Sequence, residues 1–218
     1  MVKINKHDFV EIEYTGRVLE DGTIFDTTDI EIAKKSGIYS ESSSYGPLVI
    51  CVGEGQVIKG IEVYLETADV PSETTLAIQP EEGFGRKESK WIQMIPTKKF
   101  IQQQIMPVVG LQVNIDGMMG IIKSVGGGRA IVDFNHPLSS KDLSYSIKVN
   151  RIVTEENKKI EGLLRPQLGP SVVVEQREGI FYINSSHDVP KEIQEILIQK
   201  IKEVIPSIKE ITFVKENK

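Results

Sequence analysis

Residues 52–62 read VGEGQVIKGIE, and this stretch joins a strand-forming run to a short helix. The preceding run, which begins at Leu48, is rich in β-branched residues and favours a strand. From Val57 onward the apolar residues recur at helical intervals, at positions 57, 58, 61, 64 and 65. Gly53 and Gly55 lack the third glycine of a G-x-G-x-x-G motif. We therefore predict a strand and a short buried helix, and no phosphate site.

Two stretches on either side extend this unit. Residues 9–16 partly alternate apolar and polar side chains and are followed by the turn signal EDG at 20–22, which predicts a strand and a hairpin. Residues 74–78 predict another strand, which ends at the loop QPEEGFG of residues 79–85. The polar segment 29–46 is too long for a tight turn and is expected to form a flap. The 79–85 loop is the first candidate for function.

The remaining chain predicts two further small units. Residues 86–138 hold several short β-prone runs between glycine-bearing turns, and residues 142–149 alternate well enough to return to the first sheet. Residues 154–159 are charged and are expected to form a linker or to begin a helix. Beyond them a hairpin at 172–183, an amphipathic helix from about 190 and a strand at 211–214 predict a ββαβ unit.

Composition excludes several classes of protein. The formal net charge is -5, from 31 acidic and 26 basic residues spread along the chain, so nucleic acid is not an expected partner. The first residues lack a continuous apolar stretch, and no run of about 18 apolar residues occurs, so we expect neither a signal peptide nor a membrane span. We therefore expect a cytoplasmic location. The single Cys51 and the scattered histidines His7, His136 and His187 predict no disulfide, no metal and no cofactor.

Three sequence blocks, in this order and spacing, resemble the FK506-binding-protein (FKBP) family: Tyr14-Thr15-Gly16 with Phe25-Asp26, residues 52–62, and residues 80–85. The resemblance covers about residues 1–85 and resumes at 143–147. The insertion resembles the insert-in-flap domain of the SlyD-like branch. With its C-terminal unit, the chain resembles the long archaeal FKBPs.

This resemblance implies an α+β fold in three parts. An antiparallel sheet wrapped on a short helix, residues 1–85 plus 139–155, would be the isomerase domain. Residues 86–138 would be a small β-rich insert-in-flap chaperone domain, and residues 156–218 a ββαβ C-terminal domain. The implied activity is peptidyl-prolyl cis-trans isomerisation of unfolded or partly folded clients and proline-containing peptides.

The resemblance also assigns the proline site. It implies catalytic roles for Tyr14, Asp26, Phe84 and Tyr145, and substrate contacts from Phe25, Leu48, Val57, Ile58 and Ile61, including the backbone N–H of Ile58. Taken singly, Tyr14, Leu48, Val57 and Ile58 are better explained as core residues of a β-fold, and only their combination favours a site. An apolar site favours the twisted prolyl amide because that form is less polarised than the planar one.

Three residues of the implied site depart from the family pattern, as does Ser139-Ser140, which stands where an alanine-glycine pair is common. Phe84 stands where tyrosine is usual and lacks its hydroxyl, Ile61 stands where a pocket-floor tryptophan is common, and Tyr145 replaces phenylalanine. A weakly catalytic or non-catalytic holdase, which binds unfolded chains without turning them over, is therefore the alternative function.

The insert and the C-terminal unit each leave two interpretations open. Four of the five methionines lie in the insert, where they either bind clients, because methionine gives an adaptable apolar surface, or fill a small core: Met94, Met106, Met118 and Met119. His136 is expected at a hinge. The C-terminal unit, apolar on both faces of its hairpin, is expected to form a homodimer without taking part in catalysis, or else to dock on the isomerase domain.

Overall fold

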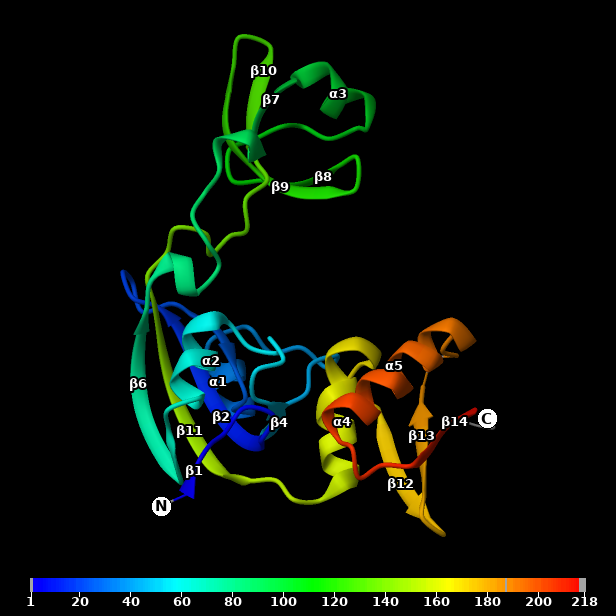
Figure 1. Cartoon of the computed structure of the whole chain (residues 1–218). Helices are drawn as coiled ribbons and strands as arrows, with labels where there is room; N and C mark the ends of the chain where they lie inside the picture. Colours follow the sequence, from blue (N-terminus) through cyan, green and yellow to red (C-terminus); the bar gives the residue numbers. More distant parts are fainter. Residues whose placement is uncertain (1, 187, 216–218) are drawn as a thin grey trace. The chain divides into compact units, whose positions relative to one another are not determined.

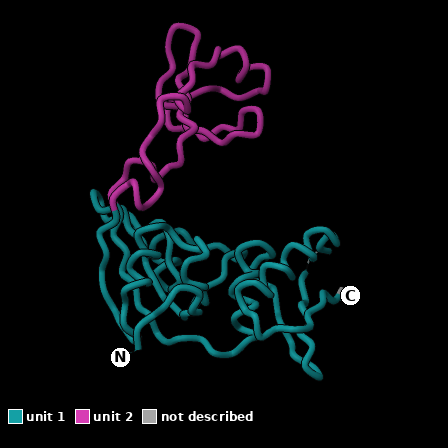
Figure 2. Tube along the Cα trace, in the orientation of Figure 1, with its two compact units in different colours: residues 1–78, 143–218 teal, residues 79–142 magenta. Residues whose placement is uncertain are grey.

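The computed structural model describes residues 2–186 and 188–215, so that His187 lies outside the described residues. Two compact units are present: residues 1–78 with 143–218, and residues 79–142 (Figure 2). The predicted α+β class is confirmed, since several antiparallel sheets combine with few helices. The three-domain division, with boundaries at 86, 139 and 156, stays a prediction.

A five-stranded antiparallel sheet organises the first unit. Its strands are β2 (Phe9–Val18), β3 (Ile24–Thr27), β4 (Leu48–Cys51), β6 (Ser72–Ile78) and β11 (Leu143–Ile152). The order is β3-β2-β11-β6, and β4 pairs with the first half of β2. β11 lies between β2 and β6, so the strand after the insert does return to the first sheet (Figure 1). β1 (Val2–Lys3) and β5 (Asp69–Val70) form a separate short pair.

The short helix predicted after residue 57 is α2 (Lys59–Leu65). Ile61 and Leu65 are buried, as the helical spacing of apolar residues requires. Gly60 allows α2 to lie close to β6, because a Cβ at this position would be 2.9 Å from a side-chain carbon of Ile78. The flap segment contains a further helix, α1 (Ile30–Lys35), whose first turn is capped by the Asp29 carboxylate.

The second unit is a small sheet with one helix. Strands β7 (Ile92–Pro96), β8 (Gln112–Ile115), β9 (Met118–Gly126) and β10 (Arg129–Asp133) lie in the order β7-β10-β9-β8, and α3 is Thr97–Gln102. Two short 3-10 helices, Pro80–Glu82 and Ser89–Trp91, precede β7. The core holds Phe100 and branched aliphatic side chains. Ile78 and Leu143, the residues that flank this unit, are directly paired across β6 and β11.

The C-terminal region has the predicted ββαβ order, preceded by a helix. Residues 156–168 form α4 (Glu156–Leu168), followed by β12 (Val173–Arg177), β13 (Ile180–Ser185), α5 (Lys191–Val204) and β14 (Glu210–Lys215). The sheet order is β12-β13-β14, with β13 and β14 parallel, as a crossover through α5 requires.

Docking of this region on the first sheet is observed. α4 contacts both β4 and β12 (Figure 1). One hydrophobic core joins Phe9, Val49 and Cys51 of the first sheet to side chains of α4, α5 and the C-terminal strands. Gly162 is required for this approach, because a Cβ on it would lie 2.7 Å from the carbonyl oxygen of Val49. Among the residues that the structure describes, no helix is long and apolar enough to cross a membrane.

Candidate active site

A cleft of about 310 Å³ lies beside β2 and β3 and is the candidate proline site. We call it the Tyr14 cleft. Its wall contains four residues predicted from the sequence, Tyr14, Phe25, Asp26 and Leu48, and also Arg165 of α4. The rest of the wall comes from the end of β3 and from the flap: Thr27, Thr28, Ile38, Ser43, Ser44, Tyr45, Gly46 and Pro47.

Tyr14 and Asp26 are joined by a hydrogen bond. The Tyr14 hydroxyl donates to Asp26 Oδ2 at 2.8 Å, because β2 and β3 pair with Gly16 opposite Asp26. Burial, and then the negative charge of Asp26, raise the pKa of Tyr14 above its usual value. The phenol therefore stays protonated at neutral pH and keeps donating to the carboxylate.

Three aromatic rings pack around Gly16. The ring of Tyr145 lies 5.8 Å from that of Tyr14 and 5.7 Å from that of Phe25, measured between centroids. A Cβ on Gly16 would come within 2.9 Å of both Phe25 and Tyr145, so only glycine allows this packing. Tyr145 is 3% exposed, and burial together with Asp26 raises its pKa. Its ring therefore supports the rings of Tyr14 and Phe25 from below the surface.

The other predicted substrate contacts lie at the start of α2. Val57 and Ile58 are half-buried, whereas Ile61 is 2% exposed and belongs to the core. The Ile58 carbonyl accepts hydrogen bonds from the N–H groups of Ile61 and Glu62, as at the beginning of a helix. Within residues 2–186 and 188–215, nothing accepts the backbone N–H of Ile58. That donor is available to a ligand.

Phe84 belongs to the other compact unit, residues 79–142. Its ring stacks on the imidazole of His136, with centroids 4.4 Å apart and planes 2° from parallel. His136 Nδ1 accepts a hydrogen bond from the N–H of Leu138, in the segment that leads back to the first sheet. Both residues therefore belong to the paired segments that connect the insert.

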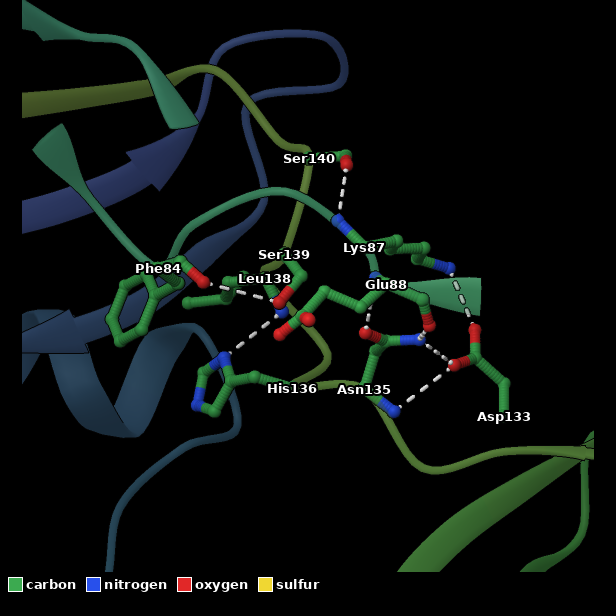
Figure 3. A network of polar contacts seen from close by, with 9 residues as sticks. All are labelled: Phe84, Lys87, Glu88, Asp133, Asn135, His136, Leu138, Ser139 and Ser140. Atoms are coloured by element: carbon green, nitrogen blue, oxygen red, sulfur yellow. Dashed lines mark hydrogen bonds and ion pairs between the residues drawn. The ribbon is translucent and has the colours of Figure 1, made fainter. Parts of the chain in front are cut away.

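Serines and an aspartate join these two segments (Figure 3). Ser139 Oγ donates to the Phe84 carbonyl, and Ser140 Oγ accepts from the N–H of Lys87. Asp133 accepts from Lys87 Nζ at 2.8 Å and from Asn135. Burial raises the pKa of Asp133, but the hydrogen bonds from Lys87 and Asn135 outweigh it and lower the pKa to about 2.

The four insert methionines are exposed, so the interpretation that they fill a core is wrong. Met94 is 58% exposed, Met106 82%, Met118 37% and Met119 52%. The core of this unit is built instead from Phe100 and branched residues, including Ile122 and Val132. Register places Met94 and Met119 on one open sheet face, which also carries three isoleucines: Ile92, Ile121 and Ile131.

Two residues in or near the site escape prediction from the sequence. Arg165 reaches the Tyr14 cleft from α4, more than a hundred residues after the other wall residues. Gln56 lies just before Val57 and binds the same helix, since its Nε2 donates to the carbonyl of Gly162 at 2.7 Å. The one local signal is Pro166, which leaves that carbonyl without its helical donor.

Comparison with known proteins agrees with this geometry. Residues 2–105 match the family model for FKBP-type peptidyl-prolyl cis-trans isomerases, and residues 93–138 match that for the FKBP26 IF domain. A short-type peptidyl-prolyl cis-trans isomerase of Methanocaldococcus jannaschii is 34% identical over 154 residues, covering 71% of this chain and 97% of the relative. SlyD of Helicobacter pylori is 31% identical over 126 residues, covering 56% and 68%.

These matches define the class of protein first: an isomerase that acts on prolyl peptide bonds. The chain belongs to the FKBP-type peptidyl-prolyl cis-trans isomerase family and carries an IF domain within its fold. The enzyme class and the SlyD-like resemblance predicted from the sequence are both confirmed.

Proposed function

We propose that the Tyr14 cleft binds a prolyl peptide bond and that the insert binds the client chain that carries it. The observation that supports the first part is the hydrogen bond between Tyr14 and Asp26 in a wall that also contains Phe25 and Leu48. A planar amide is stabilised by resonance that separates charge, and a twisted amide is less polar. A cleft with apolar and aromatic walls therefore binds the twisted amide more strongly than either planar isomer.

The residues predicted from the sequence each have a role in this scheme. Asp26 fixes the Tyr14 ring and polarises its hydroxyl, while Phe25 and Leu48 contact the proline ring. Tyr145 supports Tyr14 and Phe25 through ring packing. The free N–H of Ile58 donates to a substrate carbonyl and sets the register of the peptide. The family resemblance also assigns Phe84 an aromatic contact to substrate, without a hydroxyl.

Exposed apolar side chains support client binding by the insert. Ile92 is 44% exposed, Met94 58% and Met119 52%, and the three share one sheet face. Soluble proteins rarely leave such side chains together on the surface unless they bind a partner. Methionine side chains are flexible and adapt to different apolar partners, which suits clients of varied sequence.

The test compares a short proline peptide with an unfolded protein whose refolding is limited by proline isomerisation. The variant replaces residues 86–138 by two glycines. This join is short enough because the N–H of Ser140 already donates to the Gly85 carbonyl at 2.8 Å. We expect almost unchanged kcat/KM on the peptide and a loss of about tenfold or more on the protein, because the client site raises the local concentration of prolyl bonds. Equal losses on both substrates would contradict this division.

The departures at Phe84 and Ile61 favour the alternative, a holdase with little or no turnover. The same experiment separates the two functions. A full-length chain that binds the unfolded protein but does not accelerate isomerisation of the short peptide is a holdase. A chain that accelerates both reactions is an enzyme with a client site.

We also propose that the chain self-associates through the C-terminal region. Because this region docks on the first sheet, only one face of its own sheet is left for a second copy. The inner face of the β12-β13-β14 sheet is covered by helices. A second copy would have to cover the outer face, where Val173 is 49% exposed and Tyr182 is half-buried beside Glu175 and Arg177. Light scattering on the full chain and on a Val173→Glu variant tests this: a dimer that Val173→Glu converts to a monomer supports the interface.

A further inference from the structure

The C-terminal region contributes a positively charged side chain to the Tyr14 cleft. Arg165 lies in α4, outside both the first sheet and the insert, yet it lines the same cleft as Tyr14 and Asp26. Among the described residues that form the wall, Arg165 is the one base and Asp26 the one acid. A positive group at this place can contact the chain that flanks a bound proline.

Contacts on either side of Arg165 hold α4 in place. Gly162 brings the helix against β4, with the carbonyl oxygen of Val49 at 2.7 Å from the position of a Cβ. Pro166 has no N–H for the carbonyl of Gly162, and Gln56 Nε2 supplies that hydrogen bond at 2.7 Å. Leu163 and Leu164 are buried in the shared core. The backbone that carries Arg165 is therefore fixed relative to the first sheet.

The guanidinium of Arg165 has unused hydrogen-bond donors. It carries five N–H groups. Among the residues that the structure describes, its contact is an ion pair from Nη2 to Glu161 Oε2 at 3.4 Å, and Glu161 also accepts from the N–H of Val174. Nε is buried, and no residue within 2–186 or 188–215 accepts its N–H. Because Nε is enclosed, an incoming acceptor would pair with Nη1 and Nη2, which carry four N–H groups beside the single contact to Glu161.

We propose that Arg165 is a specificity-determining residue that binds an acidic side chain next to the proline of the client chain. This inference rests on the proposed function of the Tyr14 cleft. A carboxylate satisfies the guanidinium better than a neutral carbonyl does, because it supplies charge and two acceptor oxygens in a matching plane. The side chain is 29% exposed, so solvent weakens but does not abolish the attraction.

The test measures kcat/KM for short peptides that differ only by glutamate or glutamine, placed either immediately before or immediately after the proline. We expect the wild type to prefer glutamate by about fivefold in at least one of the two pairs. In Arg165→Gln the ratio falls to about 1, and in Arg165→Lys it falls to an intermediate value, because lysine keeps the charge without the planar fork. The matched control is Arg177→Gln on β12, outside the cleft wall, which leaves the ratio unchanged.

Two further outcomes keep the inference separate from the proposed function. A wild type that turns over both members of each pair equally overturns the role of Arg165 and leaves the isomerase site intact. A wild type that turns over none of the peptides overturns the proposed function, and the inference with it. If Arg165→Gln does not fold, the wild-type ratio decides, since it must fall toward 1 as salt rises from about 0.05 to about 0.5 M.

Discussion

The side-chain amide of Gln56 donates a 2.7 Å hydrogen bond to the backbone carbonyl of Gly162, 106 residues away in the sequence. The same amide accepts from the N–H of Cys51 at 2.7 Å. Gln56 therefore joins the end of β4 and the loop before α2 to the middle of α4. Val57 and Ile58, two of the predicted substrate contacts, follow Gln56 directly. The hydrogen bond of Gln56 therefore links them to the C-terminal region.

A double-mutant cycle tests why Gln56 is needed. Gln56→Ala should lower the free energy of unfolding by about 1–2 kcal/mol, because two partly buried backbone groups lose their partner. Pro166→Ala restores an N–H that can reach the Gly162 carbonyl within α4. We therefore expect Gln56→Ala to cost about 1 kcal/mol less in the Pro166→Ala background. Urea unfolding followed by circular dichroism measures both costs.

The neighbouring Gln167→Ala is the control for this cycle, because Gln167 is exposed on the same helix. It should change stability by less than about 0.5 kcal/mol in either background. Equal costs of Gln56→Ala with proline and with alanine at 166 would show that the Gly162 carbonyl is satisfied in another way.

The sequence predicts one wall of the cleft and misses the other for a physical reason. Tyr14, Phe25 and Asp26 lie on neighbouring strands of one hairpin, so their proximity follows from local pairing and from family motifs. Arg165 reaches the cleft only because α4 docks on β4, and docking depends on packing between residues far apart in the chain. The sequence contains Pro166, but neither the helix around it nor the hydrogen bond from Gln56 to Gly162 could be inferred from it.

The Tyr14 and Asp26 pair should control turnover. Tyr14→Phe and Asp26→Asn each remove part of the 2.8 Å hydrogen bond and should lower kcat/KM on a short proline peptide by about tenfold, with little change in stability. The double variant should cost little more than either single variant, because the two side chains act together. Thr23→Ala, in the turn before β3, is a control that should not affect turnover. Unchanged rates in both single variants would remove the pair from the site.

The raised pKa of Tyr14 predicts how this activity depends on pH. The hydroxyl stays protonated in the folded chain above its ordinary pKa of about 10. Turnover should therefore be flat from about pH 6 to about pH 9.5, whereas the contribution of Tyr14 to stability should be lost as pH rises above about 10. A fall in kcat/KM near pH 8 that disappears in Tyr14→Phe would contradict this assignment.

Phe84→Tyr restores the hydroxyl that is usual in the family. The Phe84 ring is half-buried and stacks on His136. If the ring keeps that stacking, the added hydroxyl can donate to a substrate carbonyl, and kcat/KM on a short peptide should be equal or up to about tenfold higher. Phe84→Leu, which removes the ring, should lower it. A large loss in Phe84→Tyr would show that Phe84 does not contact substrate.

The open sheet face of the insert should bind clients through its apolar side chains. Met94→Ser combined with Met119→Ser should weaken binding of an unfolded protein about tenfold, because two exposed apolar side chains no longer lose water on binding. Turnover of a short peptide should not change. The matched control is Ile196→Ser, which removes a similarly exposed apolar side chain from α5 of the C-terminal region. Equal weakening in this control would argue against a defined client site.

The lowered pKa of Asp133 predicts that acid destabilises the insert. Its carboxylate is 6% exposed and binds Lys87 and Asn135, and its pKa is lowered to about 2. A carboxylate with a lowered pKa stabilises the folded state above its unfolded pKa, near 4, and this stabilisation is lost as pH falls toward 2. The expected loss is about 2 kcal/mol. The single tryptophan, Trp91, lies in this unit and reports its unfolding by fluorescence.

Asp133→Asn should flatten this pH dependence, because asparagine cannot titrate and keeps only part of the hydrogen bonding. Lys87→Met should reduce the pH dependence without abolishing it, since Asn135 still donates to the carboxylate. Asp142→Asn serves as the control, because Asp142 is exposed and should leave the acid transition of Trp91 unchanged. A wild-type transition that is identical in Asp133→Asn would place the acid sensitivity elsewhere in the insert. Because the connecting segments carry this ion pair, its loss should also lower the rate on an unfolded protein more than the rate on a short peptide.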